Sequence, residues 1–199
     1  MLMNIDCTEV SREIRKTESA FRFEHSVSVA QTNVRLNHVF NEGLDDTLLT
    51  VCGLLHDICR EWTEERLVSY SETHHLQLQS QERMFPCLLH APVASNLLFN
   101  EGYPTGVCTA IRWHTLGSIR MGRMGLIVFI SDYLEPLRTH ITEEQRKKLL
   151  SHKSLDEVCL AILEQQDQYF QIKGKENAPS TKELEAYLKE GKTLCTDCF

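Results

Sequence analysis

The chain has 199 residues, of which 42% are hydrophobic and 25% charged, and this suits one globular domain with a proper core. Its formal net charge is −7, so no broad cationic surface is available to hold a nucleic acid or an acidic membrane, and we expect neither partner. A phosphate-bearing small molecule would instead need local positive charge from metal ions or a few arginines.

Helix start and stop signals follow one another from residue 45 onward. Asp45 can cap a helix whose apolar residues recur at helical spacing and which ends at His56 and Asp57. Thr63 begins a short helix, and Pro86 can lie in the first turn of a segment that ends before residue 102. Glycine and proline are otherwise scarce, which favours helices.

Thr105 begins a helix that reaches His114 and stops at Gly117. By periodicity the apolar run 126–130 suits a buried strand, but a single strand would leave its backbone unpaired, so we predict a helix that runs to Asp132. Gly191 ends the last helix. Three capping boxes precede further helices: Thr142-x-x-Gln145, Ser154-x-x-Glu157 and Ser180-x-x-Glu183. The pattern predicts an all-α protein.

Residues 174–179 have the composition of a surface connection, so we predict a main domain over residues 1–173 and a C-terminal helical extension and tail over 174–199. The N-terminal residues lack the apolar stretch of a signal peptide, and the longest uncharged apolar run, 125–131, is far shorter than the roughly 20 residues that cross a bilayer. We expect a cytoplasmic protein with reduced thiols. Cys195 and Cys198 form a CxxC without a second ligand pair, which we interpret as part of the tail.

The nine histidines divide into two groups by the segments around them. Five lie in polar segments and are expected on the surface: His38, His74, His75, His140 and His152. Four lie at or near predicted helices in apolar stretches: His25, His56, His90 and His114. A single histidine of the second kind is usually a hydrogen-bonded core residue, but four of them with two aspartates on separate helices indicate a metal site.

The adjacent residues His56 and Asp57 are the centre of this set. Neighbours on a helix point about 100° apart, so both can bind ions only at a helix end or between helices. A carboxylate can reach two cations through its two oxygens, whereas an imidazole binds one. Imidazole with carboxylate suits iron, manganese, zinc or cobalt better than magnesium or calcium.

The histidines and aspartates occur in the order H…HD…H…H…D, which resembles the two-metal pattern of the HD superfamily of metal-dependent phosphohydrolases. The residues in that order are His25, His56, Asp57, His90, His114 and Asp132. The surrounding segments resemble one branch, the YqeK-type symmetrical bis(5'-nucleosyl)-tetraphosphatases of bacteria. These segments are GLLHDICR (53–60), LHA (89–91), HTLG (114–117) and SDYLEPLR (131–138). The resemblance spans residues 21–163 and implies an HD-domain-like helical bundle.

The resemblance further implies symmetrical cleavage of diadenosine tetraphosphate, a small-molecule nucleotide, into two ADP by a hydroxide that bridges two metals. Iron is the implied metal, with manganese, cobalt or zinc as substitutes. One metal would be held by His25, His56, Asp57 and Asp132. The second would be held by Asp57, His90 and His114. Asp57 is therefore the expected catalytic residue, and a homodimer is left open as the oligomeric state.

Positively charged and turn residues near the metal ligands are the expected substrate contacts. They are Arg60, Thr115, Gly117 and Arg138, and the backbone N–H groups of the turn at 115–117 can face a phosphate oxygen. Arg120 and Arg123 are second-rank candidates. Glu135 can end its helix before a proline or pair with the arginine three residues on.

Three other readings of the same residues stay open. Another HD-type nucleotide phosphatase or phosphodiesterase would turn over AMP or a cyclic nucleotide instead of the tetraphosphate. A non-catalytic di-iron protein would bind metal without phosphatase activity. Such bundles usually carry Glu-x-x-His motifs, and no glutamate lies three residues before any of the four candidate histidines. A structural helical adaptor would bind no stoichiometric metal.

Overall fold

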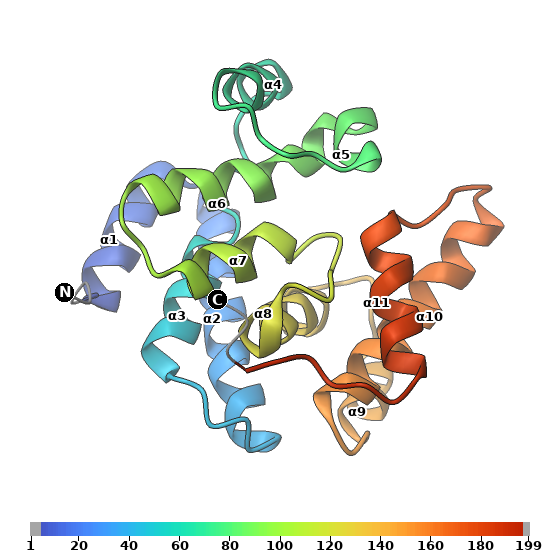
Figure 1. The fold of residues 1–199 in the computed structure, drawn as a ribbon. Coiled ribbons are helices and arrows are strands. Elements are labelled where there is room, and N and C mark those ends of the chain that lie inside the picture. The colour runs from blue at the N-terminus through green and yellow to red at the C-terminus, as the bar shows by residue number, and fades with distance from the viewer. Residues whose placement is uncertain (1–4, 197–199) are drawn as a thin grey trace.

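The computed structural model describes residues 5–196, and all regular structure in that range is helical (Figure 1). The predicted all-α fold is therefore confirmed. No helix in the described range is both long and apolar enough to cross a membrane. The α-helices and one 3-10 helix, η1, follow in the order α1 (Cys7–Thr17), α2 (Ala20–Val39), α3 (Asp46–Leu55), α4 (Glu64–Thr73), α5 (Ser80–Met84), η1 (Pro86–Leu89), α6 (His90–Asn100), α7 (Thr105–Trp113), α8 (Gly122–Leu134), α9 (Glu143–Leu150), α10 (Leu155–Ile172) and α11 (Pro179–Lys189).

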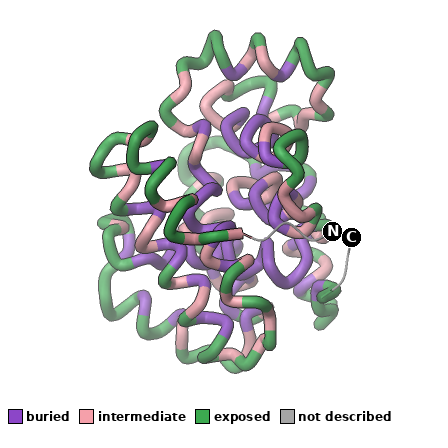
Figure 2. The backbone as a smooth tube through the Cα atoms, turned by 90° about the vertical axis from the view of Figure 1, so that its left-hand side faces the viewer, coloured by how far each residue is buried: buried purple, intermediate pink, exposed green. Residues whose placement is uncertain are grey.

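Helix α8 is the centre of the molecule, and α2, α3, α7 and α10 pack around it (Figure 1). Residues 122–131 are all buried. Most of them are apolar around the whole helix, which leaves no polar face for water, and the buried Arg123 is paired with Glu42 and Asp156. Figure 2 shows the same arrangement, with buried segments inside and exposed ones on the outer helices. The run 126–130, which by periodicity could also be a strand, is helical as predicted. Its helix places Asp132 next to His25 of α2.

A glycine lets α2 and α3 approach closely. A Cβ built on Gly53 in α3 would lie 2.3 Å from the Cα of Ala30 in α2, a distance that real side chains do not allow. The contact joins two backbones, so no flexible side chain can move to make room. Because His25 lies in α2 and His56 ends α3, this close approach also sets the distance between two of the predicted metal ligands.

We expect Gly53→Ala to lower the free energy of unfolding by about 2–3 kcal/mol, since the added methyl group forces two packed helices apart. Urea unfolding of the purified protein measures the effect. Thr50→Ala, in the same helix but only half-buried, is the matched control and should change stability by less than about 1 kcal/mol. A Gly53→Ala protein as stable as the wild type would show that the helices need not approach this closely.

Most predicted helix caps are present. Asp45 accepts hydrogen bonds from two backbone N–H groups of α3, and Thr142 forms the complete capping box of α9. Ser154 caps α10 by accepting from the N–H of Glu157 at 3.2 Å. The carboxylate of Glu157 accepts from the N–H of Lys153 at 2.9 Å, so the second half of this box is shifted by one residue.

The predicted cap at Ser180 is wrong. Helix α11 begins at Pro179 after Ala178, because proline has a helical φ and no N–H that needs a partner, which suits the first helical position. Ser180 is buried within the first turn.

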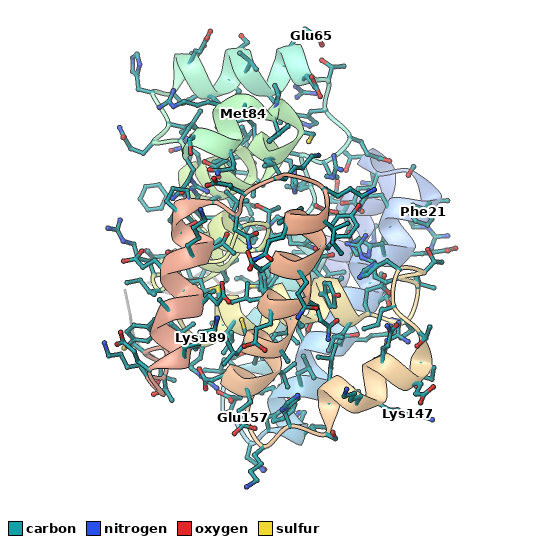
Figure 3. All side chains as sticks on the ribbon, turned by 90° about the vertical axis from the view of Figure 1, so that its right-hand side faces the viewer. Phe21, Glu65, Met84, Lys147, Glu157 and Lys189 are labelled. Atoms are coloured by element: carbon teal, nitrogen blue, oxygen red, sulfur yellow. The ribbon has the colours of Figure 1, made fainter. Side chains whose placement is uncertain are left out.

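The segment after residue 173 packs against the body of the protein. Helices α10 and α11 lie side by side (Figure 3). The hydroxyl of Thr181 donates to the carbonyl of Leu116 at 2.5 Å, and Leu184 is fully buried. The carbonyl of Cys195 accepts from the N–H of Arg123 at 3.1 Å. The domain boundary at residue 173 stays a prediction, and Cys198 of the CxxC lies outside the described residues.

Candidate metal centre

The structure brings all six predicted metal ligands together between five helices. His25 lies in α2 and Asp132 in α8, while His90 is the first residue of α6. His56 and His114 directly follow the last residues of α3 and α7, and Asp57 comes after His56. All four imidazoles and Asp57 are buried. A cluster of this kind, drawn from residues far apart in the chain, is a candidate site for chemistry.

Three of the imidazoles are oriented by carbonyl groups of their own chain segment. His56 and His114 follow helix ends, where the last carbonyl groups have no partner from a further turn. Nδ1 of each donates to the carbonyl oxygen three residues earlier at 2.8 Å. Nδ1 of His90, at the junction of η1 and α6, does the same at 2.6 Å. With Nδ1 directed at its carbonyl, Nε2 of each ring faces the centre of the cluster and is the nitrogen that can bind a metal.

A carboxylate orients the fourth imidazole. Nδ1 of His25 lies 3.1 Å from Oε1 of Glu135, a residue 110 positions later in the chain. Glu135 is almost fully buried, and its other oxygen accepts from the N–H of Leu137 at 2.7 Å. The distance from Oε1 of Glu135 to Nε of Arg138 is 3.9 Å, longer than its distance to His25. Glu135 therefore acts mainly on His25, a role that the sequence analysis did not assign to it.

The four Nε2 atoms form two pairs. Nε2 of His25 and Nε2 of His56 are 3.2 Å apart, and those of His90 and His114 are also 3.2 Å apart. Two unprotonated nitrogens cannot hydrogen-bond to one another, so each pair needs either a proton on one nitrogen or a bound cation between the two.

Asp57 joins the two pairs through its two oxygens. Oδ2 lies 3.5 Å from Nε2 of His56, whereas Oδ1 lies 3.3 Å from Nε2 of His90 and 3.6 Å from that of His114. Asp132 belongs to the first pair alone, with Oδ1 at 3.1 Å from Nε2 of His25. One aspartate is thus shared between two groups of ligand atoms.

These separations fit a transition-metal centre. Ligand atoms bound at about 2.1 Å to one cation lie roughly 3.0–3.4 Å apart at octahedral to tetrahedral angles. The separations of Nε2 of His25 and of His56 from Oδ1 of Asp132, 3.1 Å and 3.7 Å, are close to this range. Imidazole nitrogens with carboxylate oxygens suit iron, manganese, cobalt or zinc. The residues can therefore hold a divalent metal.

The carboxylates of the cluster stay ionised. Burial alone would raise the pKa of Asp57, but the charge of His56 and the neighbouring imidazoles of His114 and His90 hold it well below its usual value. Burial also opposes charge on His56, yet Asp57 and Asp132 raise the pKa of that imidazole to about 9. Burial lowers the pKa of His114. A cation bound at Nε2 of His56 would therefore replace a proton there.

Two arginines contact the carboxylates. The guanidinium group of Arg22 binds Oδ2 of Asp57, and its Nε is buried without a hydrogen-bond partner among the described residues. The guanidinium group of Arg138 binds Oδ1 of Asp132, and its Nε donates to the backbone oxygen of Asp132 at 2.8 Å. The sequence analysis missed Arg22. Its position three residues before His25 places both on one face of α2, which is a signal that the sequence contains.

A cavity of about 280 Å³ lies over the cluster. Of the predicted substrate contacts, Arg60, Thr115 and Arg138 line it. The sequence analysis also did not anticipate several of its other lining residues, which are Arg22, Leu88, Phe129, Tyr133, His140 and Gln166. The cavity therefore has charged, polar and aromatic parts above the ligand atoms.

Gly117 and the second-rank arginines do not reach this cavity. The N–H of Gly117 donates to the carbonyl of Trp113 at 2.8 Å, and a Cβ on Gly117 would lie 2.9 Å from Leu184. Its φ of +69° also favours glycine, so the residue serves the turn and the packing of α11. Arg123 is paired with Glu42 and Asp156, and Arg120 is exposed.

The chain is similar to a family of known proteins and to curated relatives. A family model described as HD domain matches residues 22–137. A protein named "Bis(5'-nucleosyl)-tetraphosphatase, symmetrical" from Staphylococcus aureus is 30% identical over 122 residues, covering 59% of this chain and 60% of the relative. A Bacillus subtilis protein of the same name is 26% identical over 145 residues, covering 68% and 73%. The first match thus leaves two fifths of that relative's length unaligned.

A solved structure shares the fold. It is a crystal structure of a predicted HD superfamily hydrolase involved in NAD metabolism from Clostridium acetobutylicum, with a TM-score of 0.82. The comparison covers 94% of this chain and 99% of that one at 23% sequence identity. At this identity the likeness concerns the arrangement of the helices and does not extend to the substrate.

Proposed function

The chain belongs to the HD domain family of phosphohydrolases, and from that premise we propose that it cleaves diadenosine tetraphosphate symmetrically into two ADP. The observation that carries the proposal is the shared position of Asp57 between two groups of imidazole and carboxylate ligands on the floor of a cavity. The names of the relatives from Staphylococcus aureus and Bacillus subtilis support the choice of substrate.

The charges around the cavity suit a polyphosphate. The whole chain carries −7, yet Arg22, Arg60 and Arg138 all line this one cavity. Guanidinium groups bind phosphate oxygens with paired hydrogen bonds. Thr115 lines the cavity, and its hydroxyl group has no hydrogen-bond partner in the described part of the chain, so its O–H can donate to a phosphate oxygen.

In the proposed reaction, the two groups of ligands hold metal and the arginines hold the phosphates. We propose that His25, His56, Asp57 and Asp132 hold one metal, and that Asp57, His90 and His114 hold a second. When bound, such cations would supply Lewis acidity and lower the pKa of a bound water. The arginines then hold the phosphates so that the central anhydride lies over Asp57. The ionised carboxylate of Asp57 contacts both groups of ligands and so sets the distance between them.

Product identification on diadenosine tetraphosphate tests the proposed function. The protein is loaded in turn with iron, manganese, cobalt or zinc, its bound metal is quantified, and the products are separated by chromatography. ADP as the sole product is the expected result, because a symmetrical cut yields two identical halves. AMP with ATP would contradict the symmetrical cut. Turnover of AMP or a cyclic nucleotide without turnover of the tetraphosphate would contradict the proposed substrate.

Arg138→Ala is expected to raise KM for the tetraphosphate about 10-fold or more while bound metal stays near the wild-type level. The reason is that a hydrogen bond to a charged group contributes roughly 1.5–3 kcal/mol. Steady-state kinetics and metal analysis on the same preparation measure both quantities. Arg138→Lys should recover part of the loss, because it restores the charge without the paired geometry.

Arg120→Ala is the matched control for this prediction, since Arg120 is exposed and does not line the cavity. It should leave KM and metal content unchanged. Equal losses of metal and of substrate binding in Arg138→Ala would assign Arg138 to the support of Asp132, the residue it contacts in the structure, instead of to the phosphates.

A further inference from the structure

One wall of the cavity is aromatic. Tyr133 in α8 and His140 in the loop before α9 both line the cavity beside Arg138. Their ring centroids are 4.8 Å apart with an interplanar angle of 64°, so the rings meet edge to face and form a corner. Gln166 of α10 also lines the cavity, and α10 is tied to this wall because the Tyr133 hydroxyl lies 3.5 Å from Oε1 of Gln165.

The residues of this aromatic corner lie at the margin of the core, against which Tyr133 packs. His140 is exposed, and Tyr133 and Gln166 are half-buried at the edge of the cavity. The amide of Gln166 makes no hydrogen bond to another described residue. Partial desolvation of the ring and the neighbouring Arg138 lower the pKa of His140, which favours the uncharged form of its ring. An uncharged aromatic wall has no positive charge to bind a phosphate group, whereas a flat heterocycle can stack on it.

We infer that the corner of Tyr133 and His140 binds a nucleobase of the substrate, with the Gln166 amide hydrogen-bonded to the polar edge of that base. The inference rests on the proposed function, because it places the base next to the phosphates that the arginines hold. Tyr133 directly follows Asp132 in α8, so a base at this corner is joined to phosphates over the ligand cluster. Stacking on aromatic rings accepts any base, and the amide supplies both a donor and an acceptor.

Direct binding of ADP and of inorganic pyrophosphate to the manganese-loaded protein tests the inference by calorimetry, without turnover. Tyr133→Leu should weaken ADP binding about 10-fold or more, since one base–aromatic stack is lost. Pyrophosphate has no base, so its affinity should change less than about two-fold. Tyr133→Phe keeps the ring and should bind ADP as the wild type does. His140→Ala, in an exposed loop where folding is not at risk, should also weaken ADP selectively.

Tyr169→Leu is the matched control, because Tyr169 is an exposed tyrosine of α10 outside the cavity. It should leave both affinities unchanged. The inference is overturned if the wild type binds ADP no more tightly than pyrophosphate. It is also overturned if Tyr133→Leu and His140→Ala weaken both ligands equally or neither. Failure to cleave diadenosine tetraphosphate would refute the proposed function instead, and the comparison of ADP with pyrophosphate would still decide the role of the corner.

Discussion

Asp57→Asn is expected to reduce turnover of diadenosine tetraphosphate on the order of 1,000-fold or more and to lower bound metal at both groups of ligands. Asparagine keeps the shape of the side chain but removes its charge and one of its two acceptor oxygens. In the structure those two oxygens face different histidines, with Oδ2 near His56 and Oδ1 near His90 and His114. Substitution of this one residue therefore weakens metal binding at both groups of ligands.

Asp132→Asn is the informative comparison, because Asp132 approaches only the group that contains His25 and His56. We expect metal to be lost from that group while the His90 and His114 group still binds one ion. Metal analysis and calorimetric titration measure how many ions the wild type and the variant bind. Asp167→Asn in α10 lies outside the cavity and serves as the control. Near wild-type turnover in Asp57→Asn would rule out a shared carboxylate between two cations.

The local rules of helix formation account for much of what the sequence predicts correctly. Asp45 caps α3 because its short carboxylate can accept from free N–H groups, and this depends on neighbours in the chain alone. The same holds for His56 and His114, which end helices and so meet unpaired carbonyl groups. The helix that carries Asp132 was predictable because one buried strand cannot satisfy its backbone.

Contacts between distant segments account for the rest. Glu135 and His25 are 110 residues apart, and only the packing of α2 against α8 makes them partners. The residues around Gly117 suggest a phosphate-binding turn, but in the fold Leu184 of α11 packs against Gly117. Arg123 looks like a free cation until the fold places acids from two other segments beside it. Local sequence carries no information on such partners.

Glu135→Leu is expected to weaken metal binding about 10- to 100-fold at the group that contains His25, and to leave the group with His90 and His114 near its wild-type affinity. The carboxylate of Glu135 fixes the proton of His25 on Nδ1 and makes Nε2 a stronger ligand, and loss of such a partner typically has this effect. Burial raises the pKa of Glu135, but hydrogen bonds from His25 and Ser28 outweigh it, so Glu135 is ionised at neutral pH.

Cobalt substitution separates this orienting role from a general loss of structure. In the cobalt-loaded protein, the Nδ1 proton of His25 should give a shifted NMR signal that Glu135→Leu removes or moves, while the signals of His90 and His114 persist. Glu135→Gln should cause a smaller loss of affinity, because its amide oxygen still accepts the proton but carries no charge. Glu144→Gln, at an exposed position of α9, should change nothing. A uniform loss of affinity at both groups would mean that Glu135 supports the fold and does not orient one ligand.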